Sequence, residues 1–173
     1  MRLHLTRGFA FTILLLAIAP GGCLASAQGA AVTIYTPYRT AAQQLAEYSG
    51  LSNSQPAWGR IFDGEQELAK MRTSRFVTFQ IPAGVHVFSA RFDIQHHAGK
   101  KNTLNLDLKE GGHYYLRFTA IAKDLVTIEL DLKETECAVA AHESEKSRPL
   151  EEKYVPVQAR SLLLKQALMP ACP

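Results

Sequence analysis

Strict alternation of apolar and polar residues is the feature that most restricts how this chain can fold. It runs through residues 104–108 and 126–132, and it returns at 77–81 and 114–120. A period of two places every second side chain on the same face of a strand, whereas an amphipathic helix needs a period near 3.6. The middle of the chain is therefore predicted to form β-strands, each with one buried and one solvated face.

Turn residues indicate where these strands reverse. A short hairpin is expected between residues 60–62 and 66–69, turning at Asp63-Gly64, a dipeptide typical of a type I′ turn. Pro82-Ala83-Gly84 and Glu110-Gly111-Gly112 are predicted to close further hairpins, because proline presets one backbone angle and glycine adopts the left-handed conformation.

Two further strands bring the expected number to about seven. Residues 32–34 begin the domain, and residues 85–94 form a longer strand. Within this longer strand the apolar positions change parity after Val87. A change of parity inside a strand predicts a β-bulge near Val87, since one extra residue restores the apolar face.

Short strands of this kind cannot all bury a face in one open sheet, so two sheets packed face to face are expected. The predicted fold class is therefore all-β: a β-sandwich of about seven antiparallel strands, immunoglobulin-like or prealbumin-like, over residues 31–133. A capping box that begins at Thr40 predicts a short helix insertion from Thr40 to Ser49. Alternation ends after Lys133, and residues 134–173 are expected to form a partly helical tail docked on the domain.

Residues 1–27 have the three-part order of a secretory signal peptide. Arg2 and Arg7 precede an apolar run from Phe9 to Ala19, and Ala25-Ser26-Ala27 offers the small residues of a cleavage site. The run of roughly eleven apolar residues is too short for a bilayer, which needs about 20. We therefore expect a secreted or periplasmic protein.

The cysteines fit an exported chain. Cys137 and Cys172 remain after removal of the leader, and an oxidising compartment favours a disulfide between them. Neither has the spacing of a metal site or a reactive thiol. Cys23 leaves an alternative open, a lipoprotein that is membrane-anchored through an acylated Cys23, although Pro20 stands where such leaders carry an aliphatic residue. This anchor would be the only contact with a membrane.

Charge argues against nucleic acid as a partner. The formal net charge is +3, and it falls to +1 when Arg2 and Arg7 leave with the leader. Binding to a phosphate backbone relies on several clustered cations. A small basic patch of Lys100-Lys101, Arg91 and Arg117 remains an alternative contact for an anionic polysaccharide, a lipid headgroup or an acidic protein.

No constellation of catalytic or metal-binding residues is evident in the sequence, so we expect no enzyme activity, metal or cofactor. The chain lacks the Gly-x-Ser-x-Gly turn of serine hydrolases and the phosphate-binding loop of nucleotide-binding proteins. His96 and His97 are neighbours, so on a strand they point to opposite faces. The alternative is a hydrolase or metal enzyme whose site, with His86, His96 and His113, assembles only in three dimensions.

Aromatic side chains are the other candidate contact surface. Tyr35, Tyr38, Tyr48 and Trp58 lie near the start of the domain. Rings with a polar edge are favoured where proteins dock, because they combine apolar area with a hydrogen-bonding group.

Several short motifs follow one another along the chain, and their order and spacing are informative. They are Ala31-Val32-Thr33-Ile34-Tyr35 with Arg39, Ile61-Phe62-Asp63-Gly64, Pro82-Ala83-Gly84-Val85-His86, and Gly112-His113-Tyr114-Tyr115. Together they resemble a family of bacterial domains of unknown function found in secreted proteins and envelope lipoproteins. The resemblance covers about residues 31–133, and it implies a β-sandwich, an exported context and no catalytic residues. The segment from Thr40 to Trp58 and the cysteine-bearing tail depart from the family pattern.

These observations lead to one expected function and two alternatives. We expect an exported, non-catalytic β-sandwich module that binds a protein or a glycan at the cell envelope. The alternatives are a lipid-anchored structural protein of the envelope and the enzyme described above.

Overall fold

The structure is a computed structural model that describes residues 29–40, 54–55, 59–92, 102–122, 128–170 and 172. The predicted signal peptide with Cys23 and the predicted helix beyond Thr40 lie outside these residues. Tyr48 and Trp58 also lie outside them.

Strands make up most of the described residues. They are β1 (Ala30–Tyr35), β2 (Ser54–Gln55), β3 (Gly59–Asp63), β4 (Gln66–Met71), β5 (Arg75–Ile81), β6 (Gly84–Arg91), β7 (Asn102–Leu108), β8 (His113–Ala122) and β9 (Ile128–Thr135). The tail adds the helix α2 (Cys137–Ser144), the two-residue strands β10 (Arg148–Pro149) and β11 (Leu163–Leu164), and the 3-10 helices η1 (Glu152–Tyr154) and η2 (Val157–Leu162). The partly helical tail agrees with the sequence-based expectation.

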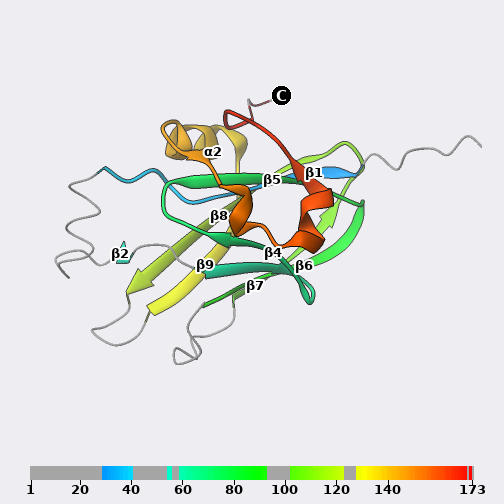
Figure 1. Cartoon of the computed structure of the whole chain (residues 1–173), viewed down its shortest axis with the longest axis horizontal. Coiled ribbons are helices and arrows are strands. Elements are labelled where there is room, and N and C mark those ends of the chain that lie inside the picture. The colour runs from blue at the N-terminus through cyan, green and yellow to red at the C-terminus, as the bar shows by residue number, and fades with distance from the viewer. Residues whose placement is uncertain are drawn as a thin grey trace, which may run out of the picture.

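The long strands form two sheets that pack face to face (Figure 1). One sheet has the order β5-β1-β8-β9, with β10 and β11 on β5 and with β2 on β8. The other sheet has the order β4-β3-β6-β7. The predicted all-β sandwich is confirmed. An immunoglobulin domain places its first two strands side by side, whereas β1 lies here between β5 and β8, so the strand order differs from that of an immunoglobulin domain.

Two strand pairs are parallel, although only antiparallel pairs were expected. β1 runs parallel to β8, and β10 runs parallel to β5. Parallel neighbours need a long connection between them, and both pairs join segments far apart in the chain. Hairpin signals in a sequence concern only adjacent strands, so they could not indicate these pairs.

The two glycine turns connect the sheets and do not close hairpins. β5 and β6 lie in different sheets, and so do β7 and β8. Gly84 has a φ of 136° and Gly111 a φ of 70°, so the predicted left-handed glycines are present. The prediction of hairpins was wrong because turn residues indicate a reversal of the chain without indicating which sheet the next strand joins.

The Asp-Gly hairpin forms, but with another turn. Asp63 pairs with Gln66, which leaves Gly64 and Glu65 at the centre of the turn. Gly64 has a φ of 56°, and it is the only one of the two with a positive φ. A type I′ turn needs positive φ at both central residues, so the predicted type is wrong and the turn resembles type II′.

The predicted bulge near Val87 is absent. The pairing of β6 with β7 continues without interruption from Gly84 opposite Leu108 to Ala90 opposite Asn102. Val85 and Val87 are 77% and 42% exposed, so they belong to the solvent face. The prediction failed because it assigned both valines to the core. The irregularity in this sheet lies instead in the β3–β4 pair, after Ile61.

The main core fills the space between the sheets. Its largest fully buried aromatic side chains are Phe79, Phe88 and Phe118, which come from both sheets. The tail contributes to this core through Leu150 and Val155. Burial of this apolar surface is the main force that holds the two sheets together.

A smaller apolar cluster lies on the outer face of the β5-β1-β8 sheet, where α2 covers it (Figure 1). It consists of Tyr35, Phe76, Tyr115 and Ala140, and Ala140 is the residue that α2 contributes.

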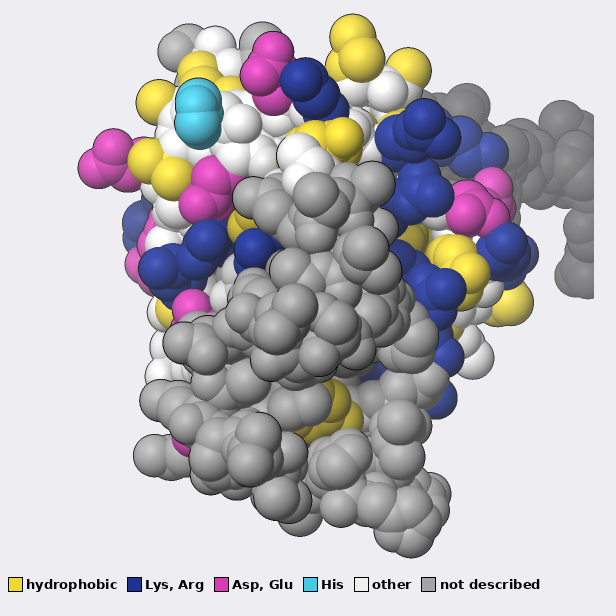
Figure 2. All heavy atoms as spheres, turned by 90° about the vertical axis from the view of Figure 1, so that its left-hand side faces the viewer, with side chains coloured by type: hydrophobic (Ala, Val, Ile, Leu, Met, Phe, Trp, Pro, Cys, Tyr) yellow, Lys and Arg dark blue, Asp and Glu magenta, His cyan; other side chains and the backbone are white. Residues whose placement is uncertain are grey.

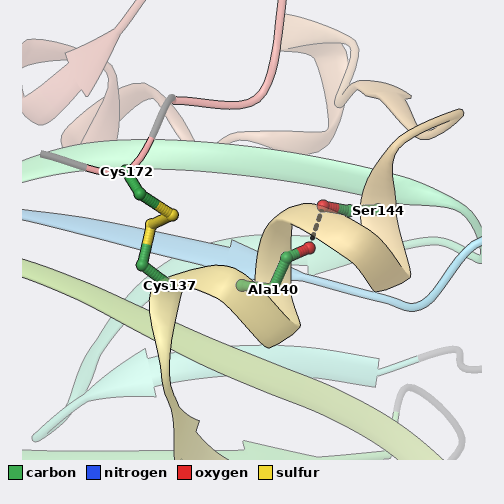
Figure 3. Close-up of a disulfide and its surroundings, with 4 residues drawn as sticks. All are labelled: Cys137, Ala140, Ser144 and Cys172. Carbon is green, nitrogen blue, oxygen red and sulfur yellow. Dashed lines mark hydrogen bonds between the residues drawn. A yellow bond between two sulfur atoms is a disulfide. The ribbon is translucent and has the colours of Figure 1, made fainter.

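The predicted disulfide is present at the start of α2. The sulfur atoms of Cys137 and Cys172 are 2.08 Å apart and the Cα atoms 5.6 Å apart (Figure 3). The hydroxyl of Ser144 donates to the carbonyl of Ala140 one turn earlier, which Figure 3 also shows. The bridge therefore ties the end of the described chain to the element that covers the outer cluster.

Candidate functional site

A cleft of about 530 Å³ opens where β1 ends and β5 begins. Three segments form its walls: the residues after β1, the β4–β5 turn and the link from α2 to β10. Its lining residues are Tyr38, Arg39, Thr73, Ser74, Arg75, Lys146 and Arg148. Four of these seven side chains are Lys or Arg, and none is Asp, Glu or His. Figure 2 shows this side of the molecule, on which Lys and Arg side chains (dark blue) gather.

Thr36 holds the first two walls together. Its buried hydroxyl donates to the carbonyl of Arg72 at 2.8 Å and accepts from the backbone N–H of Arg75 at 3.0 Å. Its own N–H donates to the carbonyl of Arg75 at 2.9 Å. A buried hydroxyl with both functions satisfied fixes the chain on either side of it, because breaking these bonds leaves unpaired polar groups.

Ser74 connects the turn to the other two walls. Its hydroxyl accepts from the backbone N–H of Arg39 at 2.9 Å, and its carbonyl accepts from the backbone N–H of Arg148 at 3.1 Å. Ser74 has a φ of 57°, a left-handed conformation that few residues other than glycine adopt. The contacts with Arg39 and Arg148 therefore keep the turn in a conformation that costs energy, as often occurs at functional sites.

A hydrogen-bonded network under α2 supports the third wall. One carboxylate oxygen of Glu143 accepts from the Tyr35 hydroxyl and from Nε of Arg117, both at 2.8 Å. The backbone carbonyl of Glu143 accepts from the N–H of Tyr38 at 2.7 Å. Burial, together with the nearby Glu143 carboxylate, raises the pKa of Tyr35 to about 12. The network thus fixes α2 against the strand that leads into the cleft.

The cleft carries more positive than negative charge. Nη2 of Arg75 lies 3.8 Å from a carboxylate oxygen of Glu151, which also binds the ammonium of Lys153. Hydrogen bonding to Lys153 lowers the pKa of Glu151, so this carboxylate stays charged. Lys146 and Arg148 are exposed, and neither makes an ion pair with any described residue.

The two described residues of the predicted aromatic surface differ in exposure. Tyr35 is fully buried, because it ends β1 on the face that α2 covers, so it cannot form part of a contact surface. Tyr38 is 38% exposed and lines the cleft. The placement of Tyr48 and Trp58 falls outside the described residues.

The basic patch considered in the sequence does not form from its described members. Arg91 lies over the ring of Phe62, 4.1 Å from its centre, and 3.5 Å from a carboxylate oxygen of Glu65. Arg117 binds Glu143 under α2. Lys100 and Lys101 lie outside the described residues. Sequence reasoning missed the cations of the cleft because they come from three distant segments and share no local pattern.

The histidines are used in other ways. Nδ1 of His86 lies 2.7 Å from a carboxylate oxygen of Asp63, and Nε2 lies 3.0 Å from the carbonyl oxygen of Pro82. His113 is exposed at the start of β8 in the other sheet, and His96 lies outside the described residues. Within the part of the chain that the structure describes, no three His, Cys, Asp or Glu side chains are grouped so as to hold a metal ion.

None of the helices in the described ranges is both long and apolar enough to cross a bilayer. Comparison of the chain with protein-family models, curated proteins and solved structures finds no match.

Proposed function

We propose that this protein is an exported, non-catalytic β-sandwich module that binds an acidic glycan or an acidic protein of the cell envelope through the cleft. One observation carries the proposal: four cations from three separate segments line one cleft, and none of the lining residues that the structure describes is Asp or Glu. The signal peptide predicted at residues 1–27 and the resemblance to domains of envelope proteins support the exported context.

The chemistry of the cleft suits an anion. Guanidinium groups bind oxyanions with two parallel hydrogen bonds, which gives both strength and orientation. Uncompensated positive charge on a surface also attracts anionic partners and raises their rate of association. Lys146 and Arg148 provide this charge at the exposed side of the cleft. An open cleft of this kind accommodates one charged group of a larger ligand.

The same residues argue for binding without catalysis. Acid–base and nucleophilic catalysis need a group that moves a proton, usually a histidine or a carboxylate close to the nucleophile. The described lining residues of the cleft include neither. The Ser74 hydroxyl accepts a hydrogen bond from the Arg39 N–H, which holds the turn in place.

Retention of the mature protein on immobilised anionic polymers tests this function. The polymers are polyphosphate, dextran sulfate, polygalacturonate and polyglutamate, with neutral dextran as the reference. The test variant is Lys146→Ser with Arg148→Ser, which removes two exposed charges and keeps the backbone N–H of residue 148. We expect the affinity for at least one anionic polymer to fall about tenfold.

The matched control is Lys133→Ser with Lys165→Ser, which makes the same change of charge at exposed residues outside the cleft. It should lower the affinity about twofold or less, because only general attraction is lost. Equal losses in the two double variants, or equal retention of the native protein on neutral dextran, would refute the cleft as the binding site.

A further inference from the structure

We infer that the group recognised in the cleft is a phosphate and not a carboxylate; this inference rests on the proposed function and specifies its ligand. Thr73 points to it. This residue lines the cleft, and its hydroxyl is buried without a hydrogen-bond partner among the described residues. A buried hydroxyl without a partner is unfavourable, because it has lost its hydrogen bonds to water. Thr73 therefore has a donor available for a bound acceptor.

The position of the cations favours a tetrahedral anion. Arg75 begins β5 two residues after Thr73, whereas Lys146 and Arg148 come from the link between α2 and β10, which pairs with the start of β5. A carboxylate has two oxygen atoms in one plane and is satisfied by a single guanidinium. A phosphate ester carries three acceptor oxygens that point in different directions and a charge near −2 at neutral pH. Cations from two segments, together with a hydroxyl that lines the same cleft, can bind such a group through several oxygens.

Hydrogen bonds hold the walls of the cleft in place before any ligand binds. Thr36 and Ser74 fix the turn that carries Thr73, and the Arg148 N–H fixes the link between α2 and β10 to the same turn. Preorganised donors lose little entropy on binding, so a small ligand is bound without rearrangement of the backbone. The phosphate can belong to a glycan, to a lipid headgroup or to the free ion, since the cleft contacts only the phosphate itself.

Calorimetric titration at constant ionic strength tests the inference. The probes are inorganic phosphate, glucose 6-phosphate and vesicles that contain phosphatidic acid, with glucuronate as the carboxylate of similar size. We expect at least one phosphate probe to bind about tenfold more tightly than glucuronate. The strongest of the three identifies the source of the phosphate. Equal or tighter binding of glucuronate would overturn the inference.

Thr73→Val is the decisive variant, because it keeps the shape of the side chain and removes the hydroxyl. We expect it to weaken phosphate binding about tenfold while leaving glucuronate binding unchanged, and we expect Thr73→Ser to retain phosphate binding. Valine at this half-buried position should leave the thermal midpoint unchanged or raise it, which serves as the control for folding. Unchanged phosphate affinity in Thr73→Val would contradict the assignment.

The two proposals fail in different ways. If phosphate and glucuronate bind equally and Lys146→Ser with Arg148→Ser still weakens the binding of both, the cleft remains the anion-binding site and only its preference for phosphate is refuted. If this double variant changes the binding of no anion, the proposed function itself falls.

Discussion

Tyr35 illustrates how a single side chain serves the fold and the cleft together. Its ring packs in the cluster under α2, and its hydroxyl donates to Glu143, which in turn binds Arg117. The sequence suggested Tyr35 as part of a contact surface, which would require its side chain to be exposed. In the folded protein it instead holds α2 in place, and α2 leads into the wall that carries Lys146 and Arg148.

The raised pKa of Tyr35 predicts a dependence of stability on pH. Its pKa is about 12 in the folded protein and near 10 in the unfolded chain, so the folded state holds the phenolic proton more tightly. The resulting stability is fully present below pH 10 and is lost as the pH rises through about 12, by roughly 1–3 kcal/mol.

Urea unfolding at pH 9 and at pH 11.5 checks this prediction, with Tyr35→Phe as the matched variant. The native protein should lose more free energy of unfolding between the two pH values than the variant, because phenylalanine has no proton to lose. Parallel losses in both proteins would show that Tyr35 does not contribute.

β6 shows how far an element can be predicted from its own residues. Its location as a strand followed from alternation, yet the inward face was assigned wrongly, because valine is usually buried and histidine usually is not. The pairing with β7 decides the question, since an unbroken register alternates the faces strictly and places Phe88 inside and Val87 outside. Register depends on partners elsewhere in the chain and is therefore not visible in one strand alone.

This assignment predicts unequal costs for neighbouring substitutions in β6. Val87→Lys should change the free energy of unfolding by less than about 0.5 kcal/mol, because the side chain already faces solvent. Phe88→Ala should cost about 3–5 kcal/mol, because it leaves a cavity between the sheets. Chemical denaturation measures both values. A large loss of unfolding free energy in Val87→Lys would show that Val87 faces the core, as the predicted bulge requires.

The tail is the second element with a measurable contribution. β10 and β11 both pair with β5, and the disulfide closes a loop whose ends are 35 residues apart in sequence. Chain-entropy arguments assign about 3–4 kcal/mol to a closure of this length. Cys137→Ser with Cys172→Ser should therefore lower the free energy of unfolding by about this amount, measured in urea against the oxidised native protein. A double variant as stable as the native protein would mean that packing alone holds the tail.

At the scale of the whole molecule, the chain crosses repeatedly between two sheets, and this crossing creates the cleft. The β4–β5 turn leads from one sheet to the other, and it meets the end of β1 and the link from α2 to β10. Alternation predicted the strands and therefore the sandwich. It could not predict that β1 pairs with β5 and β8, nor that Arg39, Arg75 and Arg148 come together. Those contacts join residues far apart in sequence, and they arise only once both sheets are assembled.

The location of a bound anion tests this reasoning most directly. Amide chemical shifts of the isotopically labelled mature protein, recorded during titration with inorganic phosphate, report where the ion binds. The amides of Ser74, Arg75 and Arg148 should shift together and saturate, whereas those of the β6–β7 pair should not move. Saturating shifts confined to another part of the molecule, or shifts that never saturate, would contradict an anion site between β1, β5 and the tail.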